Sequence, residues 1–265
     1  MLPAMLRLVL AWTLLALPVP AQWLNQPTPG LPRAADGKPN LSAPTPKAAD
    51  GHPDLSGLWK RDAAPTPRPA DAGPNNSILQ YMPAGSELEM LPWAAALYKQ
   101  RALVQLGAGR PSESCLPHSI PDQYLINVPM RFVQTPNYTV LLYEEFTHYR
   151  NIYTDGRTHP SEMQPTWFGY SIGKWEGDTF VIETRGITDR TWLDDSGHPH
   201  TESMRTLERF RRTDFGHMSL EIVIDDLKTY AKPFTLHMSF TFLPDTDFIE
   251  DICENERDVQ HITTR

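Results

Sequence analysis

The densest group of side chains able to carry out chemistry lies in and just after the long connection 186–201. It includes Asp194, His198, His200 and Glu202. If this segment is extended, alternate side chains point the same way, so the two imidazoles and the Glu202 carboxylate share one face. Such a set of ligands suits Zn or Fe, although a solvated Gly-Pro turn explains the same residues without a metal. No cofactor is therefore firmly implied.

A second polar segment, residues 154–160, contains an Asp-Gly pair, which is typical of a turn. A functional interpretation has Asp155 orient Arg157 or His159 at the mouth of a barrel. His159 is then a candidate general base, because imidazole titrates near neutral pH. Turn chemistry alone is the competing explanation.

Glu208 is a third candidate, because it falls on a strand face shared by Met204 and Phe210. Burying an ionised carboxylate is costly without a partner, and Arg150 or Arg205 is available to supply one. A desolvated carboxylate is one way to tune an acid or base, but buried Glu–Arg pairs inside barrels are more often structural. The candidate catalytic residues are His159, His198, His200, Asp194 and Glu208.

Strands must position these side chains. Residues 168–175 and 178–183 predict a hairpin around Gly177, since glycine adopts the positive φ of a tight turn. Residues 203–212 and 218–224 predict a second pair, in which apolar and polar residues alternate with the period of a half-buried strand. The remaining predicted strands cover 124–135, 138–146, 148–154, 234–242 and 248–253, and a helix is predicted over 88–106 with Pro92 in its first turn.

About ten strands joined by short turns predict an all-β fold, an antiparallel meander that closes into a barrel over residues 56–265. A two-sheet sandwich is the alternative. Two strands separate the polar loops, which places both loops at one end of the barrel. We therefore expect His159 to lie near Asp194, His198 and His200, above a cavity lined by Phe180, Met204 and Phe210. Further candidate ligand-binding residues are Arg157, Trp192 and Tyr153.

Residues 1–21 have the features of a secretory signal peptide. Arg7 precedes the apolar run 8–17, and small residues at 19–21 form a cleavage site. The run is short for a membrane span, so a retained anchor is the weaker interpretation. The signal predicts a periplasmic or secreted protein without a stable membrane anchor after cleavage.

A Pro-rich tether is predicted over residues 22–55, which lack apolar periodicity. Within it, RAADGKPNLS at 33–42 is echoed by KAADGHPDLS at 47–56, and two copies are too few for a solenoid. Each copy predicts a turn followed by a polyproline-like segment.

Cys115 and Cys253 are the two cysteines of the chain. In an oxidising compartment they are expected to form a disulfide. Two buried free thiols or a pair of metal ligands are the alternatives, and no CxxC spacing supports a metal.

Two resemblances add to this interpretation. Gly57 and Trp59 resemble the Gly-x-Trp motif that opens lipocalins, members of the calycin group of up-and-down barrels, in which the Trp closes one barrel end against an arginine from late in the chain. The TDGRTHP, GxWEGDTFVIET and GxPHTE stretches resemble a group of exported bacterial proteins without an assigned activity, most of which begin DGxPDLSGxW. The resemblance implies a lipocalin-like barrel and no particular reaction.

A net charge of −8 argues against nucleic acid as a partner. The first functional hypothesis is a barrel that binds a small hydrophobic or aromatic molecule in its cavity. The second is an enzyme on the same barrel, a lyase, isomerase or hydratase that uses His and carboxylate acid–base chemistry, with or without a metal. The chain contains no phosphate loop, dinucleotide fingerprint or HExxH.

Overall fold

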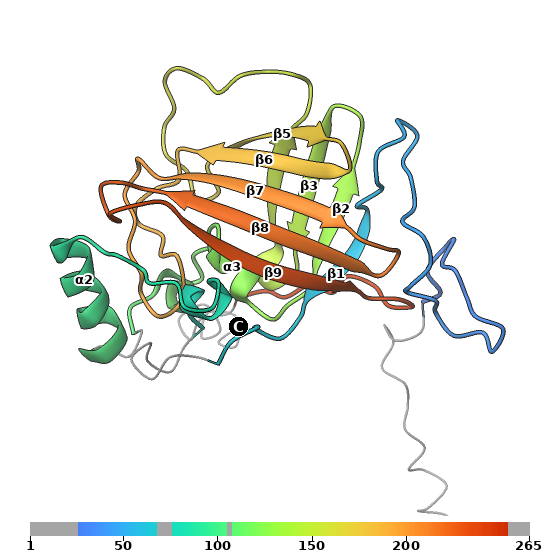
Figure 1. The fold of residues 1–265 in the computed structure, drawn as a ribbon, viewed down its shortest axis with the longest axis horizontal. Helices are drawn as coiled ribbons and strands as arrows, with labels where there is room; N and C mark the ends of the chain where they lie inside the picture. The colour runs from blue at the N-terminus through green and yellow to red at the C-terminus, as the bar shows by residue number, and fades with distance from the viewer. Residues whose placement is uncertain (1–25, 68–75, 105–107, 254–265) are drawn as a thin grey trace, which may run out of the picture.

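A computed structural model describes residues 26–67, 76–104 and 108–253 (Figure 1). The predicted signal peptide and the first residues of the predicted tether lie outside these ranges. Within the described ranges, no helix has both the length and the apolar character that a membrane crossing requires.

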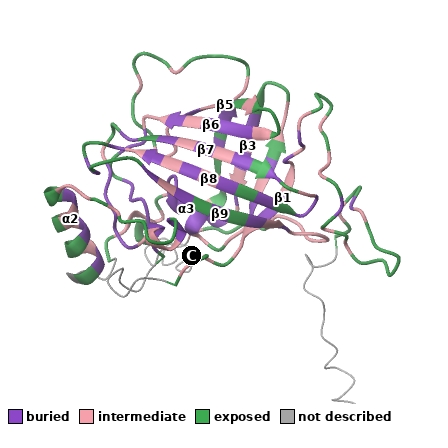
Figure 2. Ribbon diagram, viewed as in Figure 1, coloured by how far each residue is buried: buried purple, intermediate pink, exposed green. Residues whose placement is uncertain are grey.

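Nine strands form a closed barrel in which neighbours in sequence pair and β1 pairs with β9. The predicted all-β barrel is therefore confirmed. Buried and exposed residues alternate along the strands, because one side of each strand faces the packed interior (Figure 2). The strands are β1 (Gly57–Arg61), β2 (Met130–Gln134), β3 (Tyr138–Tyr143), β4 (His148–Tyr153), β5 (Tyr170–Glu176), β6 (Thr179–Arg185), β7 (Arg205–Arg212), β8 (His217–Asp225) and β9 (Phe234–Phe242).

One junction departs from an antiparallel meander, because β4 and β5 run parallel. A parallel pair needs a connection that crosses from one end of the sheet to the other, and residues 154–169 supply it by arching over the barrel (Figure 1). The β4–β5 ladder has two paired positions, against six between β3 and β4 and seven between β5 and β6. The barrel wall is therefore joined over a much shorter length at β4–β5 than at its neighbours.

The helical insert lies beside one end of the barrel and is split into two segments (Figure 1). Helix α2 (Pro92–Lys99) begins at Pro92, whose fixed φ suits a first turn, and it continues as the π-helical segment η2 (Gln100–Val104). Short 3₁₀ turns are η1 (Ile78–Tyr81), η3 (Pro111–Ser114) and η4 (Glu145–Thr147).

Two predicted strands are wrong in part or in full. The start of the predicted strand 124–135 is instead the end of the short helix α3 (Asp122–Leu125), whose four residues are all buried. The predicted strand 248–253 is not a strand, and it follows the barrel as an irregular segment held by side-chain contacts, among them that of Arg131 with Asp247 and the ring of Phe248.

The two N-terminal repeats adopt the same backbone structure and lie against the barrel at the side away from α2 (Figure 1). In each copy the Asp-Gly turn closes a small loop, with Ala34 N–H bonded to Lys38 O and Ala48 N–H bonded to His52 O. The end of the first copy is held to the β7–β8 turn by Gly216 N–H, which donates to Leu41 O at 2.7 Å. The second repeat stacks the His52 ring on Trp175, with centroids 4.8 Å apart.

Trp59 and Arg212 close the repeat-bearing end of the barrel core. Trp59 is fully buried, and the Arg212 guanidinium carbon lies 4.8 Å from the centre of its ring. Arg212 also donates to the backbone carbonyls of Asp54 and Phe215, which joins the second repeat to the β7–β8 turn. This is the Trp–Arg contact that the lipocalin resemblance implies.

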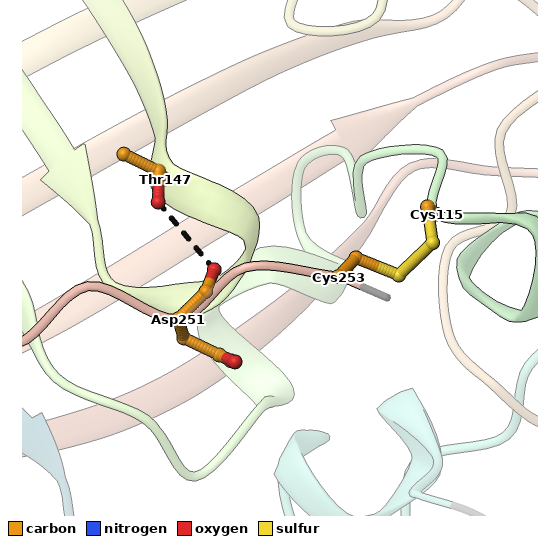
Figure 3. The surroundings of a disulfide bond; sticks show 4 residues. All are labelled: Cys115, Thr147, Asp251 and Cys253. Atoms are coloured by element: carbon orange, nitrogen blue, oxygen red, sulfur yellow. Dashed lines mark hydrogen bonds between the residues drawn. A yellow bond between two sulfur atoms is a disulfide. The ribbon is translucent and has the colours of Figure 1, made fainter. Parts of the chain in front are cut away.

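The predicted disulfide is confirmed (Figure 3). Cys115 and Cys253 have Cα atoms 5.5 Å apart and close a loop with a sequence separation of 138 residues. Thr147 Oγ1 donates to Asp251 O close by. The bond therefore fixes the segment after β9 to the chain that leads into α3.

Candidate functional site

A groove opens in the barrel wall where β4 and β5 separate. The two strands pair Ile152 with Ser171 and Tyr153 with Ile172. The same register would place residues 148–151 of β4 opposite residues 167–170, but these residues are not hydrogen-bonded to one another as a ladder. A pocket of about 530 Å³ occupies this place and is lined by both segments. This volume lies within the usual range for small-molecule sites.

The sequence before β5 explains why the two strands separate. Thr166 N–H donates to Gly186 O and Thr188 N–H donates to Thr166 O, so this segment is bound to the end of β6. Gly169 has a φ of +63°, and a Cβ there would lie 2.6 Å from Arg185 O. Because glycine permits both this conformation and this close approach, the segment lies against β6 and leaves residues 148–151 of β4 without a partner on the β5 side.

Aromatic rings and a histidine form the walls of the groove. Tyr149 is 63% exposed, which is unusual for so large a ring on a strand. Across the groove, Phe168 stacks on buried Tyr143 with centroids 5.5 Å apart. Further aromatic lining residues are Tyr153, Trp167 and Tyr170.

His148 supplies a polar atom in the wall. Desolvation by burial lowers the pKa of its imidazole, so the ring is neutral near pH 7. Its Nε2 is shielded from solvent and has no hydrogen-bond partner within the described residues. Burying an unpaired polar atom is costly, which makes this nitrogen a natural place for a ligand hydroxyl or amide.

Arg150 and Ser171 form the floor of the groove and connect it to the barrel interior. The Arg150 guanidinium, almost fully buried, binds Glu208 through Nη1 at 3.0 Å and donates to Ser171 Oγ through Nε at 3.0 Å. The Tyr124 hydroxyl, from α3, donates to the same Glu208 carboxylate at 2.7 Å. The predicted pairing of Glu208 with Arg150 is present, and every member of this network has a partner within it.

The predicted cavity residues belong to the packed core. Phe180, Met204 and Phe210 are each at most 1% exposed, and Phe210 packs edge-on against Phe132 with centroids 5.1 Å apart. Five pockets at the described surface, the groove among them, are lined by none of these three residues. The openings lie in and around the barrel wall, whereas this part of the interior is filled by side chains.

Asp194 and His198 form a buried acid–base pair. Asp194 Oδ2 lies 2.6 Å from His198 Nδ1, and the carboxylate also accepts the backbone N–H groups of Ile78, Gly197 and His198. Burial raises the pKa of the Asp194 carboxyl, but His198 and these donors outweigh burial and hold the pKa below its usual value. Since Nδ1 faces a carboxylate, Nε2 is left as the basic nitrogen.

A pocket of about 650 Å³ lies beside this pair, lined by residues 79–90 in part and by Tyr98 and His198. Tyr98, from α2, stacks on the His198 ring with centroids 3.9 Å apart. His198 Nε2 is buried and has no hydrogen-bond partner in the described part of the chain. The sequence analysis identified the pair but not Tyr98, since nothing in the helix pattern links α2 to the connection 186–201.

His200 is buried, at 4% exposure, and is therefore not part of a solvated turn. Its Nε2 lies 2.7 Å from Thr191 Oγ1 and its Nδ1 lies 3.1 Å from Thr201 O, so both ring nitrogens are occupied. Glu202 is exposed. The structure therefore does not bring His198, His200 and Glu202 together as metal ligands.

Trp192 is also buried, and the Arg101 guanidinium carbon lies 4.3 Å from the centre of its ring. Arg101 donates to Gly197 O as well. Trp192 thus packs beside the connection that carries Asp194 and lies outside both pockets described above.

The polar segment 154–160 forms a separate cluster on the outside of the barrel. Arg157 is bound to Asp155 through Nη2 at 2.6 Å, and its guanidinium carbon lies 3.9 Å from the centre of the Tyr153 ring. His159 packs edge-on against Tyr170, with centroids 6.0 Å apart. Within the described residues, no contact joins this cluster to Asp194, His198 or His200. The parallel β4–β5 pair is the reason, because it separates the exit from β4 from the connection after β6.

A buried cluster around His118 has no counterpart in the sequence analysis. Its Nδ1 lies 2.8 Å from Glu145 Oε2, and its Nε2 lies 3.3 Å from Asp195 Oδ1 and 3.6 Å from Asp122 Oδ2. Burial lowers the pKa of the His118 imidazole, but the surrounding carboxylates outweigh burial and raise it to about 11. The four residues come from three distant parts of the chain and form no motif.

No protein-family model matches this chain, and neither a curated protein nor a solved structure is similar to it at a significant level. The function is therefore argued from the sites themselves.

Proposed function

We propose that this barrel binds a small, flat, largely apolar molecule in the groove between β4 and β5. The observation that carries the proposal is the separation of the two strands, which leaves a pocket of about 530 Å³ walled by aromatic rings. Aromatic rings bind flat apolar molecules through area burial and stacking. The Tyr149 ring is largely exposed, so packing in the core does not explain why an aromatic residue stands at this position.

The groove favours a ligand with one hydrogen-bonding group. His148 offers a neutral imidazole with an unpaired Nε2, whereas Arg150 on the floor is already bound to Glu208. A single hydroxyl or amide on an aromatic frame would satisfy the histidine without introducing a buried charge. The proposed ligand class is therefore aromatic molecules that carry a hydroxyl or amide group.

Titration with two related probes tests this proposal. Binding of 2-naphthol, followed through tryptophan fluorescence or calorimetry, is compared with binding of naphthalene, which lacks the hydroxyl. The wild-type protein is expected to prefer 2-naphthol, and His148→Leu is expected to lose that preference.

Two tyrosine variants locate the binding. Tyr149→Ala removes an exposed ring of the groove, and Tyr138→Ala removes a ring that is 45% exposed on β3 outside it. We expect Tyr149→Ala to weaken 2-naphthol binding about 2- to 12-fold, the value of one aromatic contact, and Tyr138→Ala to leave it unchanged. Equal effects of the two variants would contradict a site in the groove.

We also propose that the protein is exported and that its barrel is lipocalin-like. The Cys115–Cys253 disulfide supports export, because such bonds persist in oxidising compartments. The contact of Arg212 with Trp59 supports the lipocalin-like assignment. Fractionation of cells that produce the full-length chain, with mass spectrometry of its N-terminus, tests the location.

An acid–base enzyme is the second candidate, and the Asp194–His198 pair favours it. A carboxylate on Nδ1, a free basic Nε2 and an adjacent pocket are the parts that proton abstraction requires. Proton abstraction is a common first step in lyases, isomerases and hydratases that use acid–base chemistry. The pair and the groove are lined by different residues, so the two candidate functions are tested separately.

Deuterium exchange tests the enzyme candidate before its reaction is known. Small carbonyl compounds in D₂O exchange their acidic C–H protons when a protein base acts on them, and NMR records the rate. An enzyme of this kind accelerates exchange of at least one compound, and His198→Asn abolishes the effect. His217→Asn, at an exposed His–Asp pair, is the matched control. Exchange that is unaffected by His198→Asn would exclude this histidine as the base.

A further inference from the structure

The His118 cluster brings together side chains that metal ions prefer. His118 Nε2, one oxygen of Asp122 and one oxygen of Asp195 all lie within 4.8 Å of one another. His118 and Asp122 are nine-tenths buried, and Asp195 is partly open. The three ligand atoms come from the turn before α3, from α3 itself and from the connection after β6. The tertiary fold therefore brings them together, and their positions in the sequence do not.

One buried polar atom beside this cluster has no partner in the described chain. Gln123 is 4% exposed, and its Oε1 has no hydrogen-bond partner among the described residues. Its amide lies beside the cluster, because Nε2 donates to Glu145 Oε2 at 3.5 Å. The ion-pair contact of Asp122 with His118 is long, at 3.6 Å. A buried oxygen without a protein partner is a place where a bound ion or water can supply the contact.

Glu145 positions His118 in the way that carboxylates position the histidine ligands of metal sites. Its Oε2 lies 2.8 Å from His118 Nδ1, which fixes the proton on Nδ1 and turns Nε2 toward the two aspartates. Histidines that bind metals commonly donate their other ring N–H to a carboxylate, which orients the ring and increases its basicity. Glu145 is therefore a positioning residue and the other three are the ligands.

We propose that His118, Asp122 and Asp195 bind one divalent transition-metal ion, with Glu145 supporting His118. Bonds of about 2.1 Å to a tetrahedral ion place neighbouring ligand atoms about 3.4 Å apart. The two distances from His118 Nε2, 3.3 Å and 3.6 Å, already match this spacing. One nitrogen and two carboxylate ligands suit Zn²⁺, Mn²⁺ or Fe²⁺. The proposal is independent of the groove, since no ligand residue lines it.

Calorimetry and elemental analysis of the full-length chain, freed of any affinity tag, test the proposal. The wild-type protein is titrated with Zn²⁺ and with Mn²⁺, then desalted and analysed for bound metal. We expect one equivalent of at least one of the two ions to remain. The Asp122→Asn variant keeps the size of the side chain and is expected to lose binding.

The matched control is His217→Asn, which removes an exposed histidine with its own Asp214 contact at 2.7 Å. It is expected to bind metal as the wild type does. Glu145→Gln is expected to weaken binding about 10- to 100-fold, as for other carboxylates behind a metal-binding histidine. Near-UV circular dichroism establishes that each variant is folded.

Absence of binding to the wild-type protein would overturn the proposal without any variant. Equal binding by wild type and a folded Asp122→Asn would also overturn it, since the ion would then be held elsewhere. If Asp122→Asn does not fold, Asp195→Asn at the partly open ligand decides, because unchanged affinity there would show that the ion is not held by this cluster.

Discussion

Arg150 and Glu208 form a buried ion pair at the centre of the barrel, with side chains 1% and 0% exposed. The pair lies below the groove, and Tyr124, Ser171 and Thr184 complete its hydrogen bonds. It connects α3 with β4, β5, β6 and β7, so it determines how these elements meet. A network of this kind is costly to break at one member.

Removing one partner of this pair is expected to be more harmful than removing both. Glu208→Gln leaves the Arg150 charge buried without a counter-charge, and we expect the free energy of unfolding to fall by about 3–5 kcal/mol. The double replacement Arg150→Met with Glu208→Leu removes both charges and should cost less than either Arg150→Met or Glu208→Leu alone. Chemical denaturation measures all four variants.

The exposed pair Arg205–Asp225 is the control for this experiment, with side chains 54% and 32% exposed. Asp225→Asn is expected to change stability by less than about 1 kcal/mol. Strictly additive effects of Arg150 and Glu208 replacements would argue that the two side chains do not act as a pair.

Replacing His200 is expected to destabilise the fold. His200→Ala removes a buried ring and its hydrogen bond with Thr191, whose hydroxyl still donates to Thr188 O, and we expect a loss of about 0.5–3 kcal/mol. Full retention of stability in thermal or urea unfolding would mean that the side chain is not buried as described.

Burial also makes His200 a source of pH dependence. Desolvation lowers the pKa of its imidazole below the unfolded value of 6.5. The unfolded state therefore takes up a proton first as the pH falls, and stability is lost progressively below about pH 6.5. His200→Gln should show a shallower loss of unfolding free energy between about pH 6.5 and 5. Equal slopes for variant and wild type would contradict the lowered pKa.

Adding one methyl group at Gly216 should release the N-terminal repeats from the barrel. A Cβ added at Gly216 would lie 2.4 Å from Leu41 Cβ, so Gly216→Ala pushes the end of the first repeat away from the β7–β8 turn. Limited proteolysis is expected to cut the segment before Trp59 earlier in this variant than in the wild type. Ser219→Ala, an exposed change on β8, should leave the pattern unaltered. An unchanged pattern in Gly216→Ala would show that the repeats are not held through this turn.

Loss of the disulfide should destabilise the protein through its unfolded state. The bond spans 138 residues, for which the chain-entropy model gives about 5 kcal/mol. Cys115→Ser with Cys253→Ser is expected to lower the unfolding free energy by up to this amount, measured under non-reducing conditions. A difference below about 1 kcal/mol would mean that the unfolded chain is already compact or that the bond is strained in the folded state.

The strands from β5 to β9 could be predicted from the sequence, because alternation and turn glycines such as Gly177 are local signals. The parallel β4–β5 pair could not be predicted in this way, since the crossover 154–169 looks like a long loop between antiparallel strands. α3 was hidden for a different reason: its last two residues, Tyr124 and Leu125, continue into the apolar run before β2, and the contact of Tyr124 with Glu208 is made only in the folded barrel.

The site was predictable to the extent that its residues are neighbours in sequence. Asp194 and His198 are four residues apart, and the sequence analysis placed both in one candidate site. The His118 cluster brings Asp122, Glu145 and Asp195 together through tertiary structure. The spacing of these residues in the sequence matches no metal-binding motif, so it could not have predicted the cluster. The groove likewise depends on which strand edges are unpaired, a property of topology rather than composition.

The most direct test of a binding groove is the position of a bound ligand. Crystals of the protein with 6-bromo-2-naphthol would locate the bromine by its anomalous scattering. The account predicts one bromine site between residues 148–151 of β4 and 167–170 before β5, with the naphthol oxygen within hydrogen-bond distance of His148 Nε2. Bromine in the packed interior beside Phe210, or only in the pocket next to Tyr98, would contradict it.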